Sequence, residues 1–281
     1  MRTYQACIPC IMKLFTTTLE KVSLPEDQKA DFLTRFEAYW KKADMSLPPA
    51  RTVGMIYQQV LQETGQQDLF KTQKTRGVQE ALLLYPRLKD IVAQAEDRLE
   101  AALRISALGN ILDAGNPNSY DLEEEIDRLF AAPLRGASLD LFKDRLNHAS
   151  SLLFLADNAG ETVFDRVLIE TLELPVLYAV KSAPALDDAL LEDARQAGLE
   201  RLTTLLETGT SYPGTYLPSC SPEFREIFLD ADLILAKGQA NYETLSNAKR
   251  DLFFLLKVKC EVISGEIGLP LGSLTLKYHP G

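Results

Sequence analysis

The sequence predicts an α/β protein in which a doubly wound, mainly parallel sheet domain carries an all-helical N-terminal region. Two observations lead to this fold class. In the second half of the chain, short apolar runs alternate with amphipathic segments, the pattern of parallel strands joined by crossover helices. In the first half, apolar residues recur at helical spacing and no convincing strand is visible.

The helical N-terminal region is expected to span residues 1–115. Helical spacing is clear in segments 31–42 and 78–115, while the Pro-containing segment 46–54 breaks it as a loop followed by a helix start. A turn-rich, acidic stretch follows. We therefore expect residues 116–147 to connect the helical region to the sheet domain.

The α/β catalytic domain is expected to span residues 148–281. Its candidate strands are the apolar runs 151–157, 175–182, 201–209 and 231–238. The amphipathic segments between these runs have the length of crossover helices. A further apolar stretch, residues 251–264, is expected to combine the end of a helix with a last strand.

Composition and charge exclude several classes of partner. The 281 residues carry 30 Lys and Arg against 40 Asp and Glu, a formal charge of −10, with no Lys/Arg run long enough for a basic patch. Nucleic acid is therefore not an expected partner. The apolar runs are far shorter than the ~20 residues of a membrane-spanning helix, and Lys13 interrupts the apolar N-terminus. We expect no membrane segment and a cytoplasmic location.

Polar residues follow the candidate strands at the points where the strands end. In open parallel sheets, ligands bind outside the carboxyl ends of the strands, so these residues are the first candidates for a functional site. The candidates lie at or just after the ends of these runs: Asp157, Asn158 and Glu161 for the first, Asp187 and Asp188 for the second, and Lys237, Gly238, Gln239 and Asn241 for the fourth.

Two aspartates at adjacent strand ends would repel each other unless a cation or a proton lay between them. Together with the amide oxygen of Asn158, the carboxylates of Asp157 and Asp188 form an all-oxygen donor set. Such a set suits Mg²⁺ or Mn²⁺ better than Zn²⁺. Aspartates are also common helix N-caps, so a purely structural role is the alternative.

The turn at 237–241 combines a lysine, a glycine and the start of a helix. Positive charge, backbone N–H groups and the helix dipole together favour an anion at such a turn. A hard cation beside an anion site is the arrangement that a phosphate ester needs. The alternative is that Lys237 is a solvated surface lysine.

Five motifs resemble those of the damage-control phosphatases, also known as the domain of unknown function 89 family. They are "ALGNILDAG", "FLADNAGETVFDRVLIETL", "KSAPALDDALLEDARQAGL", "LILAKGQANYETLS" and "FFLLKVKCEVI". The resemblance covers nearly the whole chain. The CxxC formed by Cys7 and Cys10, with the later Lys259–Cys260 pair, is similar to the prokaryotic, CxxC-containing branch of that family.

This resemblance implies a metal-dependent phosphatase, a phosphoric monoester hydrolase that acts on small phosphorylated metabolites such as sugar phosphates, including damaged or surplus ones. It implies a divalent metal cofactor, Mn²⁺, Mg²⁺, Ni²⁺ or Co²⁺. The family's metal ligands carry over to Asp157, Asn158 and Asp188. The family's phosphate-contacting residues carry over to Lys237, Gly238, Gln239, Ala240, Asn241 and the late Lys259.

Two positions depart from the family pattern. Many relatives have Asn-Asp where this chain has Asp187-Asp188, which adds a carboxylate beside the expected metal. Ala240 replaces a residue that is often glycine, a change that is tolerable where φ is negative. Neither change removes a metal ligand, but the first is expected to affect metal affinity or substrate choice.

The expected reaction is attack of a metal-activated water on the phosphate, with Asp187 or Glu161 orienting that water. A covalent aspartyl-phosphate through Asp157 is disfavoured, because "DNAGE" lacks the second aspartate that aspartate-nucleophile phosphatases use two positions later. Asn110 and Asp113, at the end of a long helix, are expected to help close the site, with helix capping as the alternative.

Two other functions stay open on the sequence. A metal- or redox-responsive regulatory protein would be centred on Cys7, Cys10 and Cys260, although a single CxxC without suitably spaced histidines is a poor match to a closed zinc site. Within a phosphatase, these thiols would form an accessory metal site or a redox latch, or be structural. A dinucleotide enzyme would need G-x-G-x-x-G where this chain has "DNAGET".

Overall fold

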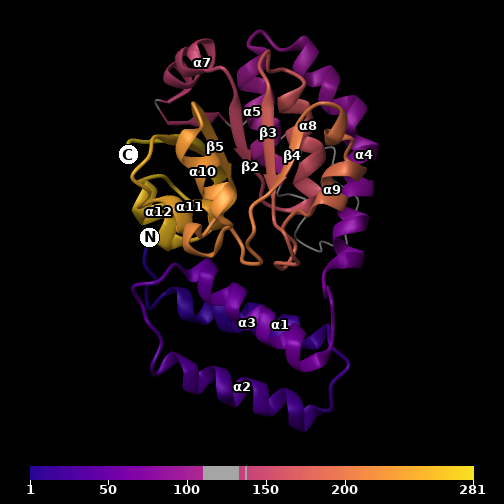
Figure 1. Ribbon diagram of the computed structural model, residues 1–281, viewed down its shortest axis with the longest axis vertical. Coiled ribbons are helices and arrows are strands. Elements are labelled where there is room, and N and C mark those ends of the chain that lie inside the picture. Colours follow the sequence, from indigo (N-terminus) through magenta and orange to yellow (C-terminus); the bar gives the residue numbers. More distant parts are fainter. Residues whose placement is uncertain (110–132, 137) are drawn as a thin grey trace.

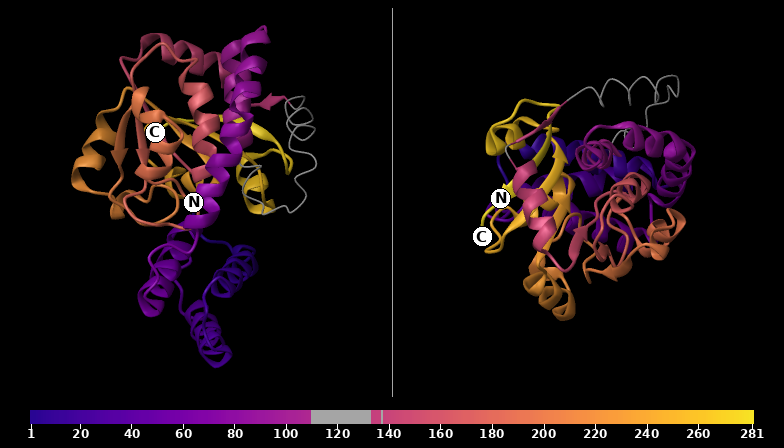
Figure 2. Two further views of the ribbon diagram at one scale, coloured as in Figure 1. Left: turned by 90° about the vertical axis from the view of Figure 1, so that its right-hand side faces the viewer. Right: turned by 90° about the horizontal axis from the view of Figure 1, so that it is seen from above.

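The computed structural model describes residues 1–109, 133–136 and 138–281. It has a mixed α/β architecture built on one seven-stranded, mostly parallel sheet, which confirms the predicted fold class (Figure 1). Helices cover both faces of the sheet, and a separate group of N-terminal helices lies beyond one end of its strands (Figure 2).

The N-terminal group consists of α1 (Cys7–Glu20), α2 (Glu26–Trp40) and α3 (Pro49–Thr64). Helix α3 begins with proline in its first turn, where no backbone donor is lost, and ends at Gly65, whose positive φ of 66° suits a helix C-terminus. The three helices bury their own apolar cluster, which includes Phe15, Phe36 and Val60. This group therefore has a core of its own.

Two further helices of the first half belong to the sheet layer instead. Helices α4 (Lys71–Gln94) and α5 (Arg98–Leu108) contribute Val78, Leu88 and Ile105 to the apolar cluster on one face of the sheet. The described part of the first half is thus helical, as predicted. Its helices pack into two different apolar cores, α1 to α3 into their own and α4 and α5 into that of the sheet. The domain boundaries at 115 and 148 stay a prediction.

The strands follow the order β1-β7-β6-β5-β2-β3-β4 across the sheet. All neighbouring pairs are parallel except β6 with β7. Their bounds are β1 Leu134–Arg135, β2 Leu152–Leu155, β3 Val176–Val180, β4 Thr204–Glu207, β5 Leu233–Lys237, β6 Leu252–Lys257 and β7 Leu274–His279. The four candidate strands of the sequence correspond to β2, β3, β4 and β5.

The C-terminal part departs from expectation. The sequence predicts the end of a helix followed by a last strand in segment 251–264, but the segment is strand β6 followed by helix α12 (Glu261–Ile267). The prediction is wrong because a fully buried strand lacks alternation and reads like a buried helix. Strands β1 and β7 are not predicted, and β1 lies inside the segment expected to be a connection.

Alternation along the strands directs side chains to two apolar clusters. In β5, Leu233 and Leu235 face the side covered by α4, α5, α7 (Leu139–His148), α8 (Thr162–Ile169) and α9 (Leu191–Gln196). Ile234 and Ala236 face the other side, covered by α10 (Pro222–Asp230), α11 (Gly238–Leu245) and α12. The three-layer packing fixes the strand ends against one another.

No described helix has both the length and the apolar character needed to cross a membrane.

Candidate active site

The segments that follow β2 and β3 pair with each other through their backbones. Asn158 and Asp188 form an isolated antiparallel bridge. The N–H of Ala189 donates to the carbonyl of Asp157 at 2.8 Å, and that of Ala159 donates to the carbonyl of Asp187 at the same distance. The two strand ends therefore hold Asp157 and Asn158 next to Asp188, as predicted from the sheet topology.

Both aspartates are buried. Asp157 is 5% exposed and Asp188 is 2% exposed. Burial, followed by the charges of Glu161 and Asp188, raises the pKa of Asp157 well above its usual value. Burial also raises the pKa of Asp188 to about 6, against the opposing effect of Lys181. Buried carboxylates near each other are relieved by a proton or a cation.

Lys181, just after β3, lies beside one of these aspartates. Its Nζ is 3.2 Å from Asp188 Oδ2 and donates to the carbonyl of Ala156 at 3.3 Å. The side chain is almost fully buried. Lys181 therefore ties the ends of β2 and β3 together and offsets part of the negative charge at the site.

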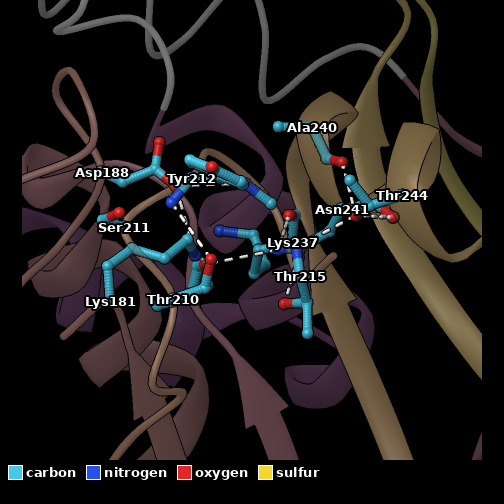
Figure 3. A network of polar contacts seen from close by, with 12 residues as sticks. Lys181, Asp188, Thr210, Ser211, Tyr212, Thr215, Lys237, Ala240, Asn241 and Thr244 are labelled. Carbon is cyan, nitrogen blue, oxygen red and sulfur yellow. Dashed lines mark hydrogen bonds and ion pairs between the residues drawn. The ribbon is translucent and has the colours of Figure 1, made fainter. Parts of the chain in front are cut away.

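A loop that follows β4 fastens the site to the start of α11 (Figure 3). The N–H of Gly214 donates to Asp188 Oδ2 at 3.3 Å, and Thr215 Oγ1 donates to Asn241 Oδ1 at 2.7 Å. Asn241 in turn donates to the carbonyls of Ala156 and Lys237. The loop, the end of β2 and helix α11 thus share one hydrogen-bonded network.

Lys237, at the end of β5, lies in a second buried polar cluster. Its Nζ is 2.8 Å from Glu161 Oε2 and 2.6 Å from Asp165 Oδ1. Ser106 and Tyr178 also donate to Asp165, at 2.7 and 2.8 Å. Burial alone would lower the pKa of Lys237, but the two carboxylates outweigh it and raise the pKa.

A cavity of about 720 Å³ opens at these strand ends, between the sheet layer and the N-terminal helices. Asp157, Asn158 and Asp188 line it, together with Lys259, which follows β6. The far wall comes from helices α1 and α3, so the cavity is closed partly by the helical group. Oxygen donors and a lysine therefore line one cavity at the carboxyl end of the sheet.

Comparisons with known proteins show the family of the chain. The model of the damage-control phosphatase ARMT1-like domain family matches residues 3–275 of the chain. The chain belongs to this family. Its relatives named as phosphatases support a phosphatase function for the chain.

Individual members of the damage-control phosphatase family match over most of their length. A damage-control phosphatase of Pyrococcus horikoshii is 31% identical, with 98% of this chain and 97% of that protein aligned. A damage-control phosphatase of Archaeoglobus fulgidus is 31% identical over 79% of this chain and 80% of its own. The crystal structure of a DUF89 family protein from P. horikoshii superposes with a TM-score of 0.87 at 30% identity, covering 99% of both chains.

Several residues expected at the family's phosphate site line the cavity and others do not. Gln239 and Ala240, at the start of α11, are in its wall, as are Asp187 and Lys259. Gly238 and Asn241 belong to the same turn but are buried behind the wall. Asn110 and Asp113 lie outside the described residues.

The position of Lys237 corrects an expectation. The sequence places this lysine against a phosphate, whereas its ammonium group is buried between Glu161 and Asp165 and does not line the cavity. Glu161, expected to orient a water, is the partner of Lys237 and is also absent from the cavity wall. Strand direction places a Cα, but it does not determine where a flexible lysine points.

The three predicted thiols do lie together at the cavity. Cys7 and Cys10 of α1 and Cys260 at the start of α12 all line it. Burial is the main cause of a raised pKa for both Cys7 and Cys10, with the nearby Cys260 adding to it. All four cysteines are free thiols, and Cys220 is buried elsewhere. No cluster of three or more His, Cys, Asp or Glu within the described ranges is arranged to hold a metal ion.

The sequence analysis did not identify two charged residues that lie in the buried polar groups at the site. Lys181 lies at the end of the candidate strand 175–182, as Asp157 lies at the end of 151–157, so the rule that identified Asp157 would also have identified it. Asp165 gave no such signal, because it lies within helix α8 and only the packing against Lys237 reveals its role.

Proposed function

We propose that this protein is a metal-dependent phosphatase that hydrolyses phosphate monoesters of small phosphometabolites. The observation that carries the proposal is the pairing of the β2 and β3 ends, which buries Asp157 and Asp188 side by side at a cavity that Lys259 also lines. This arrangement concentrates negative charge where a cation would bind, and the cation and Lys259 would together attract a phosphate.

The proposed ligands of the cation are Asp157, Asn158 and Asp188. Two carboxylates and one amide supply hard oxygen donors, which fit Mg²⁺, Mn²⁺, Co²⁺ or Ni²⁺. The raised pKa values of both aspartates support this assignment, since a cation would relieve the repulsion that burial intensifies. When bound, the cation would neutralise phosphate charge and make water more acidic.

The residues of the chain itself would bind and orient the ester. Lys259 offers a positive charge to the phosphate oxygens from the cavity wall. The backbone N–H groups at Gln239 and Ala240 lie in the first turn of α11, where helix N–H groups favour an anion. Phosphoryl transfer depends mainly on such positioning and charge neutralisation.

Asp187 is the proposed general base. It lines the cavity next to Asp188, and a carboxylate there can accept a proton from the attacking water. Glu161 is paired with Lys237 instead.

Leu186, the residue before Asp187, has a φ of 55° and is the one non-glycine residue of the described chain with a positive φ. This backbone strain is held by the packing of Leu186 in a cluster with Tyr57 and Phe70, and it fixes the direction of Asp187.

Lys237 is proposed as a positioning residue. Its ion pairs with Glu161 and Asp165 join the end of β5 to the segment that carries Asp157. Helix α11 begins directly after Lys237, so the same ion pairs fix the start of that helix against the strand end. Lys237 therefore supports the site without touching the ester.

The cysteine-centred alternative has less support. No group of three or more His, Cys, Asp or Glu among the described residues, Cys7, Cys10 and Cys260 included, is arranged to hold a metal ion. Burial raises the pKa of Cys7 and Cys10, which lowers the share of thiolate that redox exchange needs. The three thiols are therefore proposed as an accessory group at the edge of the cavity.

The experiment that tests this function is a screen of phosphorylated metabolites against Mg²⁺, Mn²⁺, Co²⁺ and Ni²⁺, with release of inorganic phosphate as the readout. Hydrolysis that requires one of these ions, and that a chelator removes, is the expected result. Absence of hydrolysis with every ester and ion would contradict the proposal.

A further inference from the structure

The walls of the cavity differ in character from one side to the other. The strand ends supply the polar side. The opposite side is formed by α1, α3 and Leu186. Its side chains are apolar: Ile11, Leu14, Val53 and Leu186. The phosphate belongs at the strand ends, so the organic part of an ester must lie toward this apolar wall.

The charges on the cavity wall are strongly unequal. Five carboxylates line it, those of Asp157, Asp187, Asp188, Glu243 and Glu261. The positive charges on the same wall are Lys259, its single Lys or Arg among the described residues, and the N-terminal ammonium group of Met1, which lies beside Glu243. A divalent cation at Asp157 and Asp188 would leave the carboxylates in excess, so an ester with additional negative charge would meet unfavourable like charges.

We propose that the substrates are phosphate monoesters of uncharged alcohols that have an apolar face. This inference rests on the proposed phosphatase function and names the class of ester that the same site accepts. One phosphate is held between the cation and Lys259. The uncharged organic group packs against Val53 and Leu14, whereas bisphosphates and phosphorylated acids are disfavoured by the charges of Asp187, Glu243 and Glu261.

A matched pair of aryl esters tests the charge preference. We expect kcat/KM for 4-methylphenyl phosphate to exceed that for 4-carboxyphenyl phosphate by about tenfold, because the second carries one more negative charge into the acidic wall. Equal values for the two esters would overturn the inference while leaving the phosphatase function intact. No hydrolysis of either aryl ester by protein that hydrolyses other phosphate monoesters would overturn the inference alone. Absence of hydrolysis with every ester and ion would overturn the phosphatase function as well.

Two variants separate the cavity wall from general effects of net charge. Glu261 and Glu223 are both exposed acidic residues in the first turn of a helix, α12 and α10, but only Glu261 lines the cavity. Glu261→Gln should reduce the preference for the neutral ester by about threefold, and Glu223→Gln should leave it unchanged. An equal effect of the two substitutions would contradict a role of the wall.

The apolar wall has its own test. Val53→Thr keeps the shape of the side chain but replaces one of its methyl groups by a hydroxyl group at the wall. We expect it to raise KM for 4-methylphenyl phosphate by about threefold and to leave KM for glycerol phosphate unchanged, since only the aryl ester has an apolar face. The same increase for both esters would show that the organic group does not pack against α3.

Discussion

The carboxylate of Asp157 lies directly against the α-carbon of Gly238. A Cβ built on Gly238 would be 1.8 Å from Asp157 Oδ2, closer than any real contact, and the φ of Gly238 is +77°. The proposed metal ligand at the end of β2 and the first residue of α11 therefore fit together only because position 238 has no side chain. This contact couples the proposed cation site to the helix start that faces the cavity.

Gly238→Ala should displace the Asp157 carboxylate and reduce hydrolysis by about a hundredfold, the effect expected of a misplacement near 1 Å. The unfolding free energy should fall by about 2 kcal/mol or more, from the positive φ and the overlap together. Steady-state kinetics and denaturant unfolding measure the two effects.

Gly268→Ala is the matched control for that substitution. Gly268, at the end of α12, has nearly the same φ, +79°, and a Cβ added to it would have no other atom within 4 Å. It should lose about 1 kcal/mol of stability from the backbone strain alone and keep full activity. If both alanine variants were equally active, the contact between Gly238 and Asp157 would have no functional role.

Lys237→Met should destabilise the protein by about 3–5 kcal/mol, because it leaves Glu161 and Asp165 buried without their cation. Lys29→Met, which removes an exposed pair with Glu26, should cost less than about 1 kcal/mol. Denaturant unfolding of both variants makes the comparison. Similar losses would mean that the buried cluster contributes no more than a surface pair.

The pKa of Asp188 gives a pH dependence with a definite sign. Its folded value of about 6 lies above the ordinary value of 3.8, so the folded state holds the proton more tightly than the unfolded state. In chelator-treated protein, the unfolding free energy should therefore fall as pH rises from about 4 to 6. Asp188→Asn should lack this contribution, at about 1.4 kcal/mol per unit of pKa shift.

Other carboxylates titrate in the same pH range, so the contribution of Asp188 is the difference between the stability profiles of the wild type and of Asp188→Asn. Added Mn²⁺ should remove the fall in the wild-type protein, since a bound cation favours the ionised carboxylate. Parallel profiles of wild type and Asp188→Asn without metal would contradict the assigned direction of the shift.

Replacing both Cys7 and Cys10 by serine should leave kcat/KM within about twofold of wild type, because these thiols lie at the edge of the cavity rather than among the proposed ligands. Hydrolysis of an aryl phosphate under reducing conditions measures this. Loss of hydrolysis in a folded, metal-supplied double variant would move the centre of the chemistry to the CxxC.

The parallel sheet was predictable because apolar runs and helical segments alternate at the spacing of crossover units, and β2, β3, β4 and β5 follow that pattern. The pairing of Asp157 with the segment of Asp188 also follows, since parallel neighbours end at the same edge of the sheet. Both inferences depend on backbone direction, which sequence patterns report well.

The direction and burial of individual side chains were harder to predict from the sequence. Lys237 looked like an anion ligand, and only tertiary packing shows that Asp165 binds it from within a helix. Segment 251–264 looked like a helix end because all-buried strands lack alternation. The short strand β1 has two residues, too few for any pattern to show.

The most direct test of the account is hydrolysis of an aryl phosphate by Asp157→Ala and Asp188→Ala with Mn²⁺ supplied, beside Asp144→Ala, which removes an exposed carboxylate from α7. We predict that both site variants fold, by circular dichroism, and lose at least about a hundredfold in kcat/KM, while Asp144→Ala retains full activity. Full activity of both site variants would contradict the central claim that these two aspartates form the catalytic site.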